Sequence, residues 1–444
     1  MKRRYFGTDG VRGRVGKEPM TVDFALRLAS AAARVLAPDG GKVLIGKDTR
    51  VSGYMFESAL EAGFVAAGVD VLLVGPLPTP GIAYLTRWFD ADFGIVLSAS
   101  HNLYYDNGIK FFDARGAKLS DGVEAQIEEW LDKPVVTRDS VALGRAKRVD
   151  SARFDYQEFC KSTIPEGVEL AGLKIVIDCA HGAAYKTAPR VLAELGAEIV
   201  PIGCSPNGRN INDGCGSTHP ELLQLTVTGV RAHLGIALDG DGDRVIMADE
   251  CGELVDGDQL LYVIAAARHA EHALQGPVVG TVMSNLGLEQ ALAAKGIEFQ
   301  RASVGDRHVL EMLRRHHGAI GGETSGHVIC LDKTTTGDGL ISALQVVAIV
   351  KKSGLPLSAL VADMTKYPQK LLNVRTDRPV DLDASSIVRD AVQQAEAELG
   401  ERGRVVLRPS GTEPVIRVMV EGLDDAKVSR VAEQIASAVK QAAD

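Results

Sequence analysis

The stretch "KVLIGKDTR" at residues 42–50 decides the fold class, because its pattern returns twice along the chain. In each copy a short apolar run ends in a polar loop, and a helical segment and a second apolar run follow. The later copies begin with "KIVIDCAHGAA" at 174–184 and "PVVGTVMSNLG" at 277–287. Short Val- and Ile-rich runs that alternate with helical segments are typical of parallel βαβ units. The sequence therefore predicts three similar α/β domains with mostly parallel sheets.

Each repeat also supplies a third apolar run that ends in a loop of unusual composition. These runs are "GIVLSASHN" (94–102), "LGIALDGDGDR" (234–244) and "HGAIGGETSGH" (317–327). The C-terminal stretch differs, is typical of a small α+β domain, and has its own polar loop within "RVVLRPSGTEPVIRVMVEG" (404–422). Ligands of open parallel sheets bind beyond the carboxyl ends of the strands. We therefore expect one active site in a central cleft between all four domains, predicted at residues 1–155, 156–256, 257–366 and 367–444.

Composition and charge exclude several classes of function. Asp and Glu outnumber Lys and Arg, and the net charge of −9 argues against a nucleic-acid-binding protein. No apolar run reaches the length of a membrane span, and "MKRRYFGTDG" at 1–10 lacks the apolar stretch of a signal peptide. The six cysteines are scattered without a C-x-x-C pair, so neither a disulfide framework nor a zinc site is expected. We expect a cytoplasmic protein that binds neither nucleic acid nor membrane.

The loop "DGDGDR" at 239–244 predicts a metal site. Asp239, Asp241 and Asp243 alternate with glycines, whose permissive dihedral angles let the three carboxylates converge. Three hard oxygen ligands suit Mg²⁺. One alternative is an EF-hand, with Glu250 at position 12, but position 6 is Arg244 instead of glycine and the flanks are typical of strands. The other alternative is an acidic turn without a metal, in which the three carboxylates would repel one another.

Two further loops have the composition of ligand-binding loops. In "RPSGTEP" (408–414), Ser410, Gly411 and Thr412 offer hydroxyl and amide donors, and Arg408 and Arg417 offer guanidinium groups for a phosphate. A β-turn is the alternative reading of this loop.

The loop "GGETSGH" (321–327) offers Glu323, Ser325 and His327, which suit the hydroxyls of a sugar. A solvated loop with a capping glutamate is the alternative reading.

The serine loop "SASHN" at 98–102 is by itself most typical of a turn or a helix cap. Beside a Mg²⁺ site and a phosphate-binding loop, its Ser100 becomes a candidate phosphate carrier. The G-x-S-x-G elbow of a serine hydrolase is not present at this place. Phosphoryl transfer instead needs alignment and charge neutralisation, which the metal and nearby cations would supply.

With these loops in this order, the chain resembles the α-D-phosphohexomutase superfamily over essentially its full length. The resemblance rests on "YFGTDGVRG" (5–13), "SASHN", "NINDGCGSTHPE" (210–221), "DGDGDR", "GGETSGH" and "RPSGTEPVIRVMVEG". Within the superfamily the chain is most similar to the branch that acts on glucosamine phosphate. The resemblance implies an isomerase that interconverts glucosamine 6-phosphate and glucosamine 1-phosphate for UDP-N-acetylglucosamine synthesis and cell-wall precursors.

The resemblance also implies a set of roles for individual residues. Ser100 would be a phosphoserine required for activity, and its phosphate the fourth ligand of one Mg²⁺ held by the three aspartates. A hexose 1,6-bisphosphate would be the intermediate and activator. Glu323, Ser325 and His327 would bind the sugar, and the loop at 408–412 with Arg417 the distal phosphate. Lys110 and Arg12 are candidates for acid–base catalysis, and a homodimer is an assembly that this reading allows.

The sequence departs from the superfamily pattern at two positions. Leu103 stands where proline usually follows "SASHN", which frees φ and leaves the rigidity of the loop open. Thr324 stands where glutamine is common, so discrimination among sugars is expected to be looser. The alternatives that stay open are a phosphomannomutase or phosphoglucomutase, a sugar phosphatase, and a non-catalytic sugar-phosphate sensor.

Overall fold

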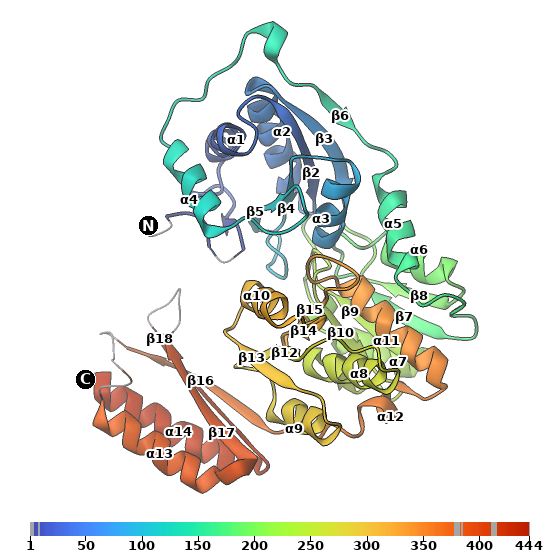
Figure 1. Cartoon of the computed structure of the whole chain (residues 1–444), viewed down its shortest axis with the longest axis vertical. Helices are drawn as coiled ribbons and strands as arrows, with labels where there is room; N and C mark the ends of the chain where they lie inside the picture. The colour runs from blue at the N-terminus through green and yellow to red at the C-terminus, as the bar shows by residue number, and fades with distance from the viewer. Residues whose placement is uncertain (1–3, 8, 377–381, 383–384, 410–414, 444) are drawn as a thin grey trace.

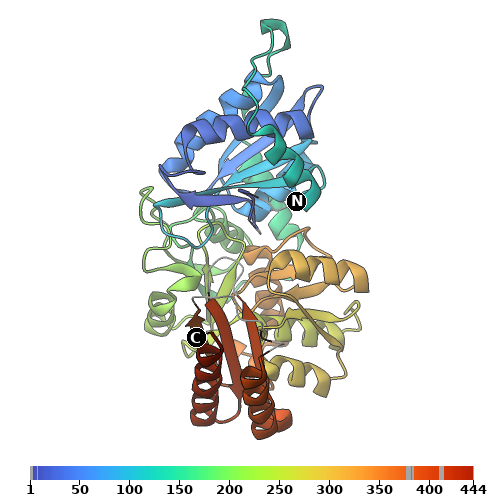
Figure 2. The same cartoon turned by 90° about the vertical axis from the view of Figure 1, so that its left-hand side faces the viewer.

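Four β-sheets follow one another along the chain, and we call the parts built on them units I to IV. The computed structural model describes residues 4–7, 9–376, 382, 385–409 and 415–443. Unit I lies at one end of an elongated molecule, units II and III form the middle, and unit IV lies at the other end (Figures 1 and 2). None of the helices in the described residues combines the length and apolar character that a membrane crossing needs.

Unit I is built on a six-stranded sheet of order β1-β5-β4-β2-β3-β6. Its strands are β1 (Val11–Arg14), β2 (Gly41–Lys47), β3 (Val69–Pro76), β4 (Phe93–Leu97), β5 (Asp106–Asp113) and β6 (Ala146–Arg148). Its helices are α1 (Val22–Leu36), α2 (Ser52–Ala66), α3 (Thr79–Trp88) and α4 (Asp121–Trp130). Strands β2, β3, β4 and β6 run parallel, and β5 lies antiparallel to both β4 and β1.

Units II and III repeat this plan on smaller sheets. Unit II has the order β11-β10-β9-β7-β8, and unit III has β13-β12-β14-β15. Unit II contains α5 (Ala152–Ser162), β7 (Lys174–Asp178), α6 (Ala188–Glu194), β8 (Glu198–Ile202), α7 (Glu221–Val230), β9 (Leu234–Leu238), β10 (Val245–Ala248) and β11 (Leu254–Val255). Unit III contains α8 (Gly257–Ala270), β12 (Val278–Thr281), α9 (Leu286–Ala294), β13 (Phe299–Ala302), α10 (Asp306–His316), β14 (Ile320–Gly322), β15 (Val328–Cys330), α11 (Gly339–Ser353) and α12 (Leu357–Val361).

The repeat predicted from the sequence is confirmed by the strand order. In all three units the third strand of the repeat lies between the first strand and an antiparallel fourth strand. Each Asp-Gly pair after the fourth strand marks the start of a helix. Asp256 and Asp338 cap α8 and α11 by accepting backbone N–H bonds, and Ser120 caps α4 just before Asp121. The third strands β4, β9 and β14 therefore end in equivalent places, and their loops emerge on one side.

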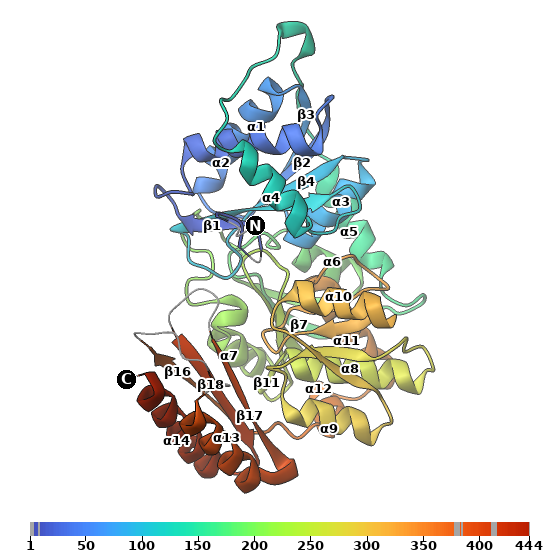
Figure 3. The ribbon, with the colours of Figure 1, turned by 60° about the vertical axis from the view of Figure 1, so that its left-hand side comes forward.

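Unit IV is the predicted α+β part, with an antiparallel sheet of order β16-β18-β17. It contains β16 (Gln369–Arg375), α13 (Ser386–Leu399), β17 (Gly403–Pro409), β18 (Val415–Gly422) and α14 (Asp425–Ala443). Its apolar core is separate, whereas one buried cluster runs continuously through units I, II and III. Figure 3 shows unit IV beside unit III with its two helices on the outer face of its sheet. Units I to III are thus packed as one body, and unit IV is attached to it.

The exact domain boundaries stay a prediction. The four sheets lie within residues 11–148, 174–255, 278–330 and 369–422, and the limits proposed at 155, 256 and 366 fall between them.

Candidate active site

Ser100 lies in the loop that follows β4, where unit I meets unit II at the loop 239–244, which we call the metal loop. Its side chain is buried, at 1% relative exposure, and its φ of 51° lies in the left-handed region. The Ser100 Oγ donates a hydrogen bond of 2.6 Å to Asp239 Oδ2. His101 Nδ1 lies 3.5 Å from the same hydroxyl. The structure thus brings the predicted carrier hydroxyl into direct contact with the predicted metal loop.

The neighbouring serine has a different environment. Ser98 Oγ donates to Asp48 Oδ2 over 2.6 Å and accepts the Ser100 N–H over 3.0 Å, and its side chain has no exposed surface. Both hydrogen-bonding functions of this hydroxyl are therefore used inside unit I. Of the two serines, only Ser100 lines the cavity described below.

The three aspartates converge as predicted. One carboxylate oxygen from each of Asp239, Asp241 and Asp243 lies within 4.8 Å of the others, and all three residues are buried. Asp241 Oδ1 and Asp243 Oδ1 are buried without a hydrogen-bond partner among the described residues. Burial and the neighbouring carboxylates Asp243 and Asp241 raise the pKa of Asp239 well above its usual range. A bound cation would give the two unpaired carboxylate oxygens a partner and would relieve the repulsion among the three carboxylates.

The EF-hand alternative is wrong. The loop is flanked by the antiparallel strands β9 and β10, not by helices. Glu250, the residue at the twelfth position, accepts a hydrogen bond from the Ser358 hydroxyl instead. Gly240 explains the spacing of the loop, because a Cβ there would lie 2.7 Å from the Ser100 carbonyl oxygen. Only glycine lets the metal loop approach the serine loop so closely.

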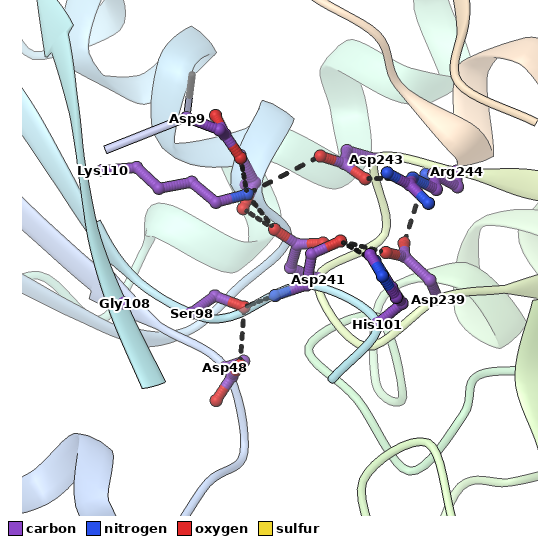
Figure 4. Close-up of polar contacts among 12 residues, drawn as sticks. Asp9, Asp48, Ser98, His101, Gly108, Lys110, Asp239, Asp241, Asp243 and Arg244 are labelled. Carbon is purple, nitrogen blue, oxygen red and sulfur yellow. Dashed lines mark hydrogen bonds and ion pairs between the residues drawn. The ribbon is translucent and has the colours of Figure 1, made fainter. Parts of the chain in front are cut away.

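Lys110 lies on β5 beside the serine loop, and its ammonium group points among carboxylates from two units (Figure 4). Its Nζ lies 2.7 Å from Asp241 Oδ2, 2.9 Å from Asp9 Oδ2 and 3.7 Å from Asp243 Oδ2. Burial alone would lower the pKa of Lys110, but these three carboxylates raise it above its usual range. Lys110 is therefore held as a cation. Arg12, the other acid–base candidate, pairs with Asp9 and lines the cavity.

A second lysine joins units I and III, and sequence reasoning missed it. Lys118 Nζ lies 2.6 Å from Asp9 Oδ1 and 2.6 Å from Asp306 Oδ2. Asp9 stands in the stretch 5–13 that carried the resemblance, whereas nothing in the sequence marked Lys118 or Asp306. Arg244, which closes the metal loop, also lines the cavity, and its backbone N–H donates to Asp239 Oδ1 over 3.2 Å.

The predicted sugar loop follows β14 and reaches the same place. Glu323 lines the cavity, and its Oε1 accepts the Gly305 N–H over 3.0 Å. His327 is buried between Asp243 Oδ2, at 3.8 Å, and Asp306 Oδ2, at 3.5 Å. Burial by itself would lower the pKa of His327, but these two carboxylates raise it to about 9. Ser325 is exposed and is not among the described residues that line the cavity.

Ser100, Asp243, Glu323 and His327 line a cavity of about 680 Å³. Its lining comes from the N-terminal loop and serine loop of unit I, the metal loop of unit II, and the sugar loop and start of α10 in unit III. Both cationic and anionic side chains line it, as recognition of a polar, charged small molecule requires. The expected convergence of the three repeat loops is confirmed.

Comparison with known proteins agrees with this architecture. Models of the phosphoglucomutase/phosphomannomutase family match four successive parts of the chain. They are alpha/beta/alpha domain I (residues 3–135), domain II (155–252), domain III (256–367) and the C-terminal domain (371–438). The chain belongs to the phosphoglucomutase/phosphomannomutase family.

Individual relatives span the whole chain. A phosphoglucosamine mutase of Thioalkalivibrio sulfidiphilus is 60% identical over 100% of this chain and 99% of its own length. Among solved structures, a phosphoglucomutase/phosphomannomutase family protein from Burkholderia thailandensis has a TM-score of 0.81 at 25% identity, covering 98% of this chain and 97% of its own. The N-acetylphosphoglucosamine mutase of Aspergillus fumigatus, solved with GlcNAc-6P and magnesium, has a TM-score of 0.70 at 18% identity, covering 100% and 96%.

The departure from the family pattern at Thr324 has a structural explanation. The Thr324 hydroxyl donates to Asp258 Oδ2 over 2.7 Å, at the start of α8, and Thr324 is not among the described residues that line the cavity. Burial first, and Asp256 second, raise the pKa of Asp258 to about 6. The threonine thus anchors the sugar loop, and its hydroxyl is directed away from the sugar position that the sequence reading assumed.

The predicted phosphate-binding part of this family member lies in unit IV and is only partly described. Arg408 on β17 and Arg417 on β18 are paired across the sheet, and both Nε atoms are buried without a hydrogen-bond partner among the described residues. Burial and the like charge of Arg417 lower the pKa of Arg408, whereas Glu323 acts in the opposite direction. Ser410, Gly411 and Thr412 lie outside the described residues.

The expectation of a cleft lined by all four domains stays a prediction for unit IV, whose loop at 410–414 lies outside the described residues. The described residues that line the cavity come from units I, II and III, and none comes from unit IV. Unit IV is attached to unit III where Arg404 donates to the carbonyl oxygens of Val282 and Ser284, in the loop after β12. Its Arg408 lies near enough to Glu323, which lines the cavity, for that carboxylate to act on the pKa of Arg408.

Proposed function

We propose that this protein interconverts glucosamine 6-phosphate and glucosamine 1-phosphate, with Ser100 as the phosphoryl carrier. One observation carries the proposal. The Ser100 Oγ lies 2.6 Å from Asp239 at the wall of a cavity large enough for a hexose phosphate. The relatives that match the whole chain are phosphoglucosamine mutases, which supports glucosamine phosphate as the substrate over mannose or glucose phosphate.

Asp239, Asp241 and Asp243 would hold one Mg²⁺, with a phosphate on Ser100 as a fourth ligand. When bound, the ion would neutralise charge on the phosphoryl group during transfer. Support for this assignment comes from the two orphaned carboxylate oxygens and from the lack of any nitrogen or sulfur ligand in the cluster. Magnesium in the structural relative from Aspergillus fumigatus is consistent with it.

The reaction consists of two transfers in opposite directions. In the first, the bond between Ser100 Oγ and phosphorus breaks, the 1-oxygen of glucosamine 6-phosphate bonds to that phosphorus, and the proton of the 1-hydroxyl passes to Ser100 Oγ. The resulting 1,6-bisphosphate turns end for end. In the second transfer the bond between the 6-oxygen and phosphorus breaks, Ser100 Oγ bonds to that phosphorus and its proton passes to the 6-oxygen, which releases glucosamine 1-phosphate.

The chain's own residues bind and neutralise the reacting groups. Lys110 and Arg12 are the proposed candidates for acid–base catalysis, and the raised pKa of Lys110 keeps this side chain a cation that can stabilise charge on the transferring phosphoryl group. Glu323, Ser325 and His327 are proposed to bind the sugar. The loop of Arg408, Ser410, Gly411 and Thr412, with Arg417, is proposed to bind the distal phosphate.

Coupled mutase assays on glucosamine, glucose, mannose and N-acetylglucosamine phosphates test the proposal. We expect kcat/KM for glucosamine phosphate to exceed that for glucose or mannose phosphate by about tenfold or more. Intact-mass analysis should find a phosphorylated fraction that disappears in Ser100→Ala. Equal efficiency with mannose or glucose phosphate would favour the phosphomannomutase/phosphoglucomutase alternative. Release of inorganic phosphate without mutase turnover would indicate a phosphatase, and neither reaction would indicate a sensor.

A further inference from the structure

Among the described residues, Arg50 is the largest fully buried side chain, and its guanidinium group hydrogen-bonds to the serine loop. Its guanidinium group donates to the carbonyl oxygens of Ser100 at 3.0 Å and Asn102 at 2.7 Å. It also donates to the carbonyl oxygens of Leu103 and Asp106. One side chain therefore binds four backbone carbonyl oxygens within residues 100–106, around the carrier serine. None of the roles assigned above uses Arg50.

Asp48 balances this buried charge and extends the contact to the other side of the loop. Asp48 Oδ2 accepts from Arg50 Nε over 2.8 Å and from Ser98 Oγ over 2.6 Å. Ser98 Oγ in turn accepts the N–H of Ser100 over 3.0 Å. The carbonyl and the amide of Ser100 are thus both connected to the same buried ion pair.

Asn212 approaches the loop from unit II. Its Nδ2 donates to the carbonyl oxygens of Ser100 and Asn102, both at 2.9 Å, and the residue is buried at 1% exposure. It stands in the stretch 210–221, which contributed to the resemblance but which the proposed function leaves without a role. Arg50 and Asn212 therefore grip the same two carbonyls from two different units.

The conformation of Ser100 explains why two side chains bind the same carbonyl oxygens. Ser100 has a φ of 51°, a conformation that residues other than glycine and asparagine rarely adopt, and which persists only where the surroundings enforce it. Leu103 supplies no proline ring to restrict the loop, so restraint must come from hydrogen bonds. Charge-assisted bonds from a guanidinium in a buried site are among the strongest available.

We propose that Arg50 and Asn212 are positioning residues for phosphoryl transfer: together they fix the left-handed backbone of Ser100 so that its Oγ faces Asp239. The inference rests on the proposed function, because it gives these residues a role in the use of Ser100 as carrier. Neither residue is among the described residues that line the cavity, so neither is expected to bind the sugar phosphate.

The test uses the full-length variants Arg50→Lys and Asn212→Ala, with Arg115→Lys as the control. Lysine keeps the charge of Arg50 but cannot reach four carbonyls, and Asn212→Ala removes two bonds without burying a new charge. The side chain of Arg115 is 86% exposed and pairs with Asp113 in the same unit. Steady-state kinetics with glucosamine 6-phosphate would be measured with hydrogen exchange of the peptide spanning 98–106.

Misplacement of a reacting group by about 1 Å costs about 10²-fold in rate. We therefore expect kcat to fall by about that factor in Arg50→Lys and by about tenfold in Asn212→Ala, with KM nearly unchanged, because an interaction that only orients the carrier leaves substrate binding intact. Exchange at 98–106 should accelerate in both, and the control should match the parent protein. The inference is overturned if the parent protein turns over normally and Asn212→Ala either retains the parent kcat or shows a raised KM together with a lowered kcat. A parent protein without turnover would instead overturn the proposed function.

Discussion

Replacing Lys118 with methionine should loosen the contact between units I and III. Lys118 bridges Asp9 and Asp306, each at 2.6 Å, and the three side chains are 15%, 18% and 13% exposed. Lys118→Met keeps the length of the side chain but removes the cation that Asp9 and Asp306 share, while Asp9 keeps Lys110 and Arg12 and Asp306 keeps His327 as partners. Removing one partner of a fully buried pair costs about 3–5 kcal/mol, and removing an exposed one costs about 1 kcal/mol or less. For this intermediate burial we expect about 2–3 kcal/mol.

Native-state hydrogen exchange of α10 measures this loss directly, because Asp306 is the first residue of that helix. A change of 2–3 kcal/mol raises the opening constant of α10 by about 30- to 150-fold. Arg115→Met is the control, since its exposed pair with Asp113 should contribute almost nothing. The double variant Lys118→Met/Asp306→Asn should recover part of the protection, because it removes one of the two facing charges. Unchanged exchange of α10 in Lys118→Met, or an equal change in Arg115→Met, would refute the reasoning.

Three further outcomes are expected. Asp241→Asn should weaken Mg²⁺ binding while the fold survives, and calorimetric titration with unchanged affinity would count against the metal loop. Arg417→Ala should weaken sugar-phosphate binding by about tenfold or more, since a charge-assisted bond contributes about 1.5–3 kcal/mol, while phosphorylation of Ser100 persists; a normal KM and kcat would remove Arg417 from the site. The pKa of Asp258 is raised to about 6 in the folded protein, so the folded state binds the extra proton and this residue makes stability fall as pH rises from about 4 to 6. Asp258→Asn should flatten that part of the urea-midpoint profile, and an unchanged slope would contradict the assignment.

Local patterns in the sequence predicted the repeat correctly, and the three loops that they singled out meet at one cavity. Short apolar runs, the Asp-Gly pairs and the alternation in "DGDGDR" act over a few residues, so their structural consequences can be read without the fold. Thr324 shows the limit of such reading. The sequence reading treated its side chain as part of sugar discrimination, whereas its hydroxyl bonds to Asp258, a partner 66 residues earlier in the chain.

Ion pairs between residues far apart in the chain could not be predicted from the sequence. Nothing near Lys118 in the chain indicates that it would meet Asp9 and Asp306, because that contact depends on how units I and III pack. In the sequence, Arg50 was only the last residue of the polar loop in the stretch 42–50, whereas in the structure it is fully buried against the serine loop.

The sequence by itself determined the three α/β repeats, the distinct C-terminal part, and which loops carry hydroxyl, carboxylate and guanidinium chemistry. These properties follow from side-chain type and short-range periodicity, which every copy of the chain shares whatever its packing. Only the tertiary structure decided that Ser100, and not Ser98, faces the aspartates, and that Lys118 lies between Asp9 and Asp306. Both depend on distances between segments more than a hundred residues apart. Packing of the core shared by units I, II and III sets these distances, and no local pattern encodes them.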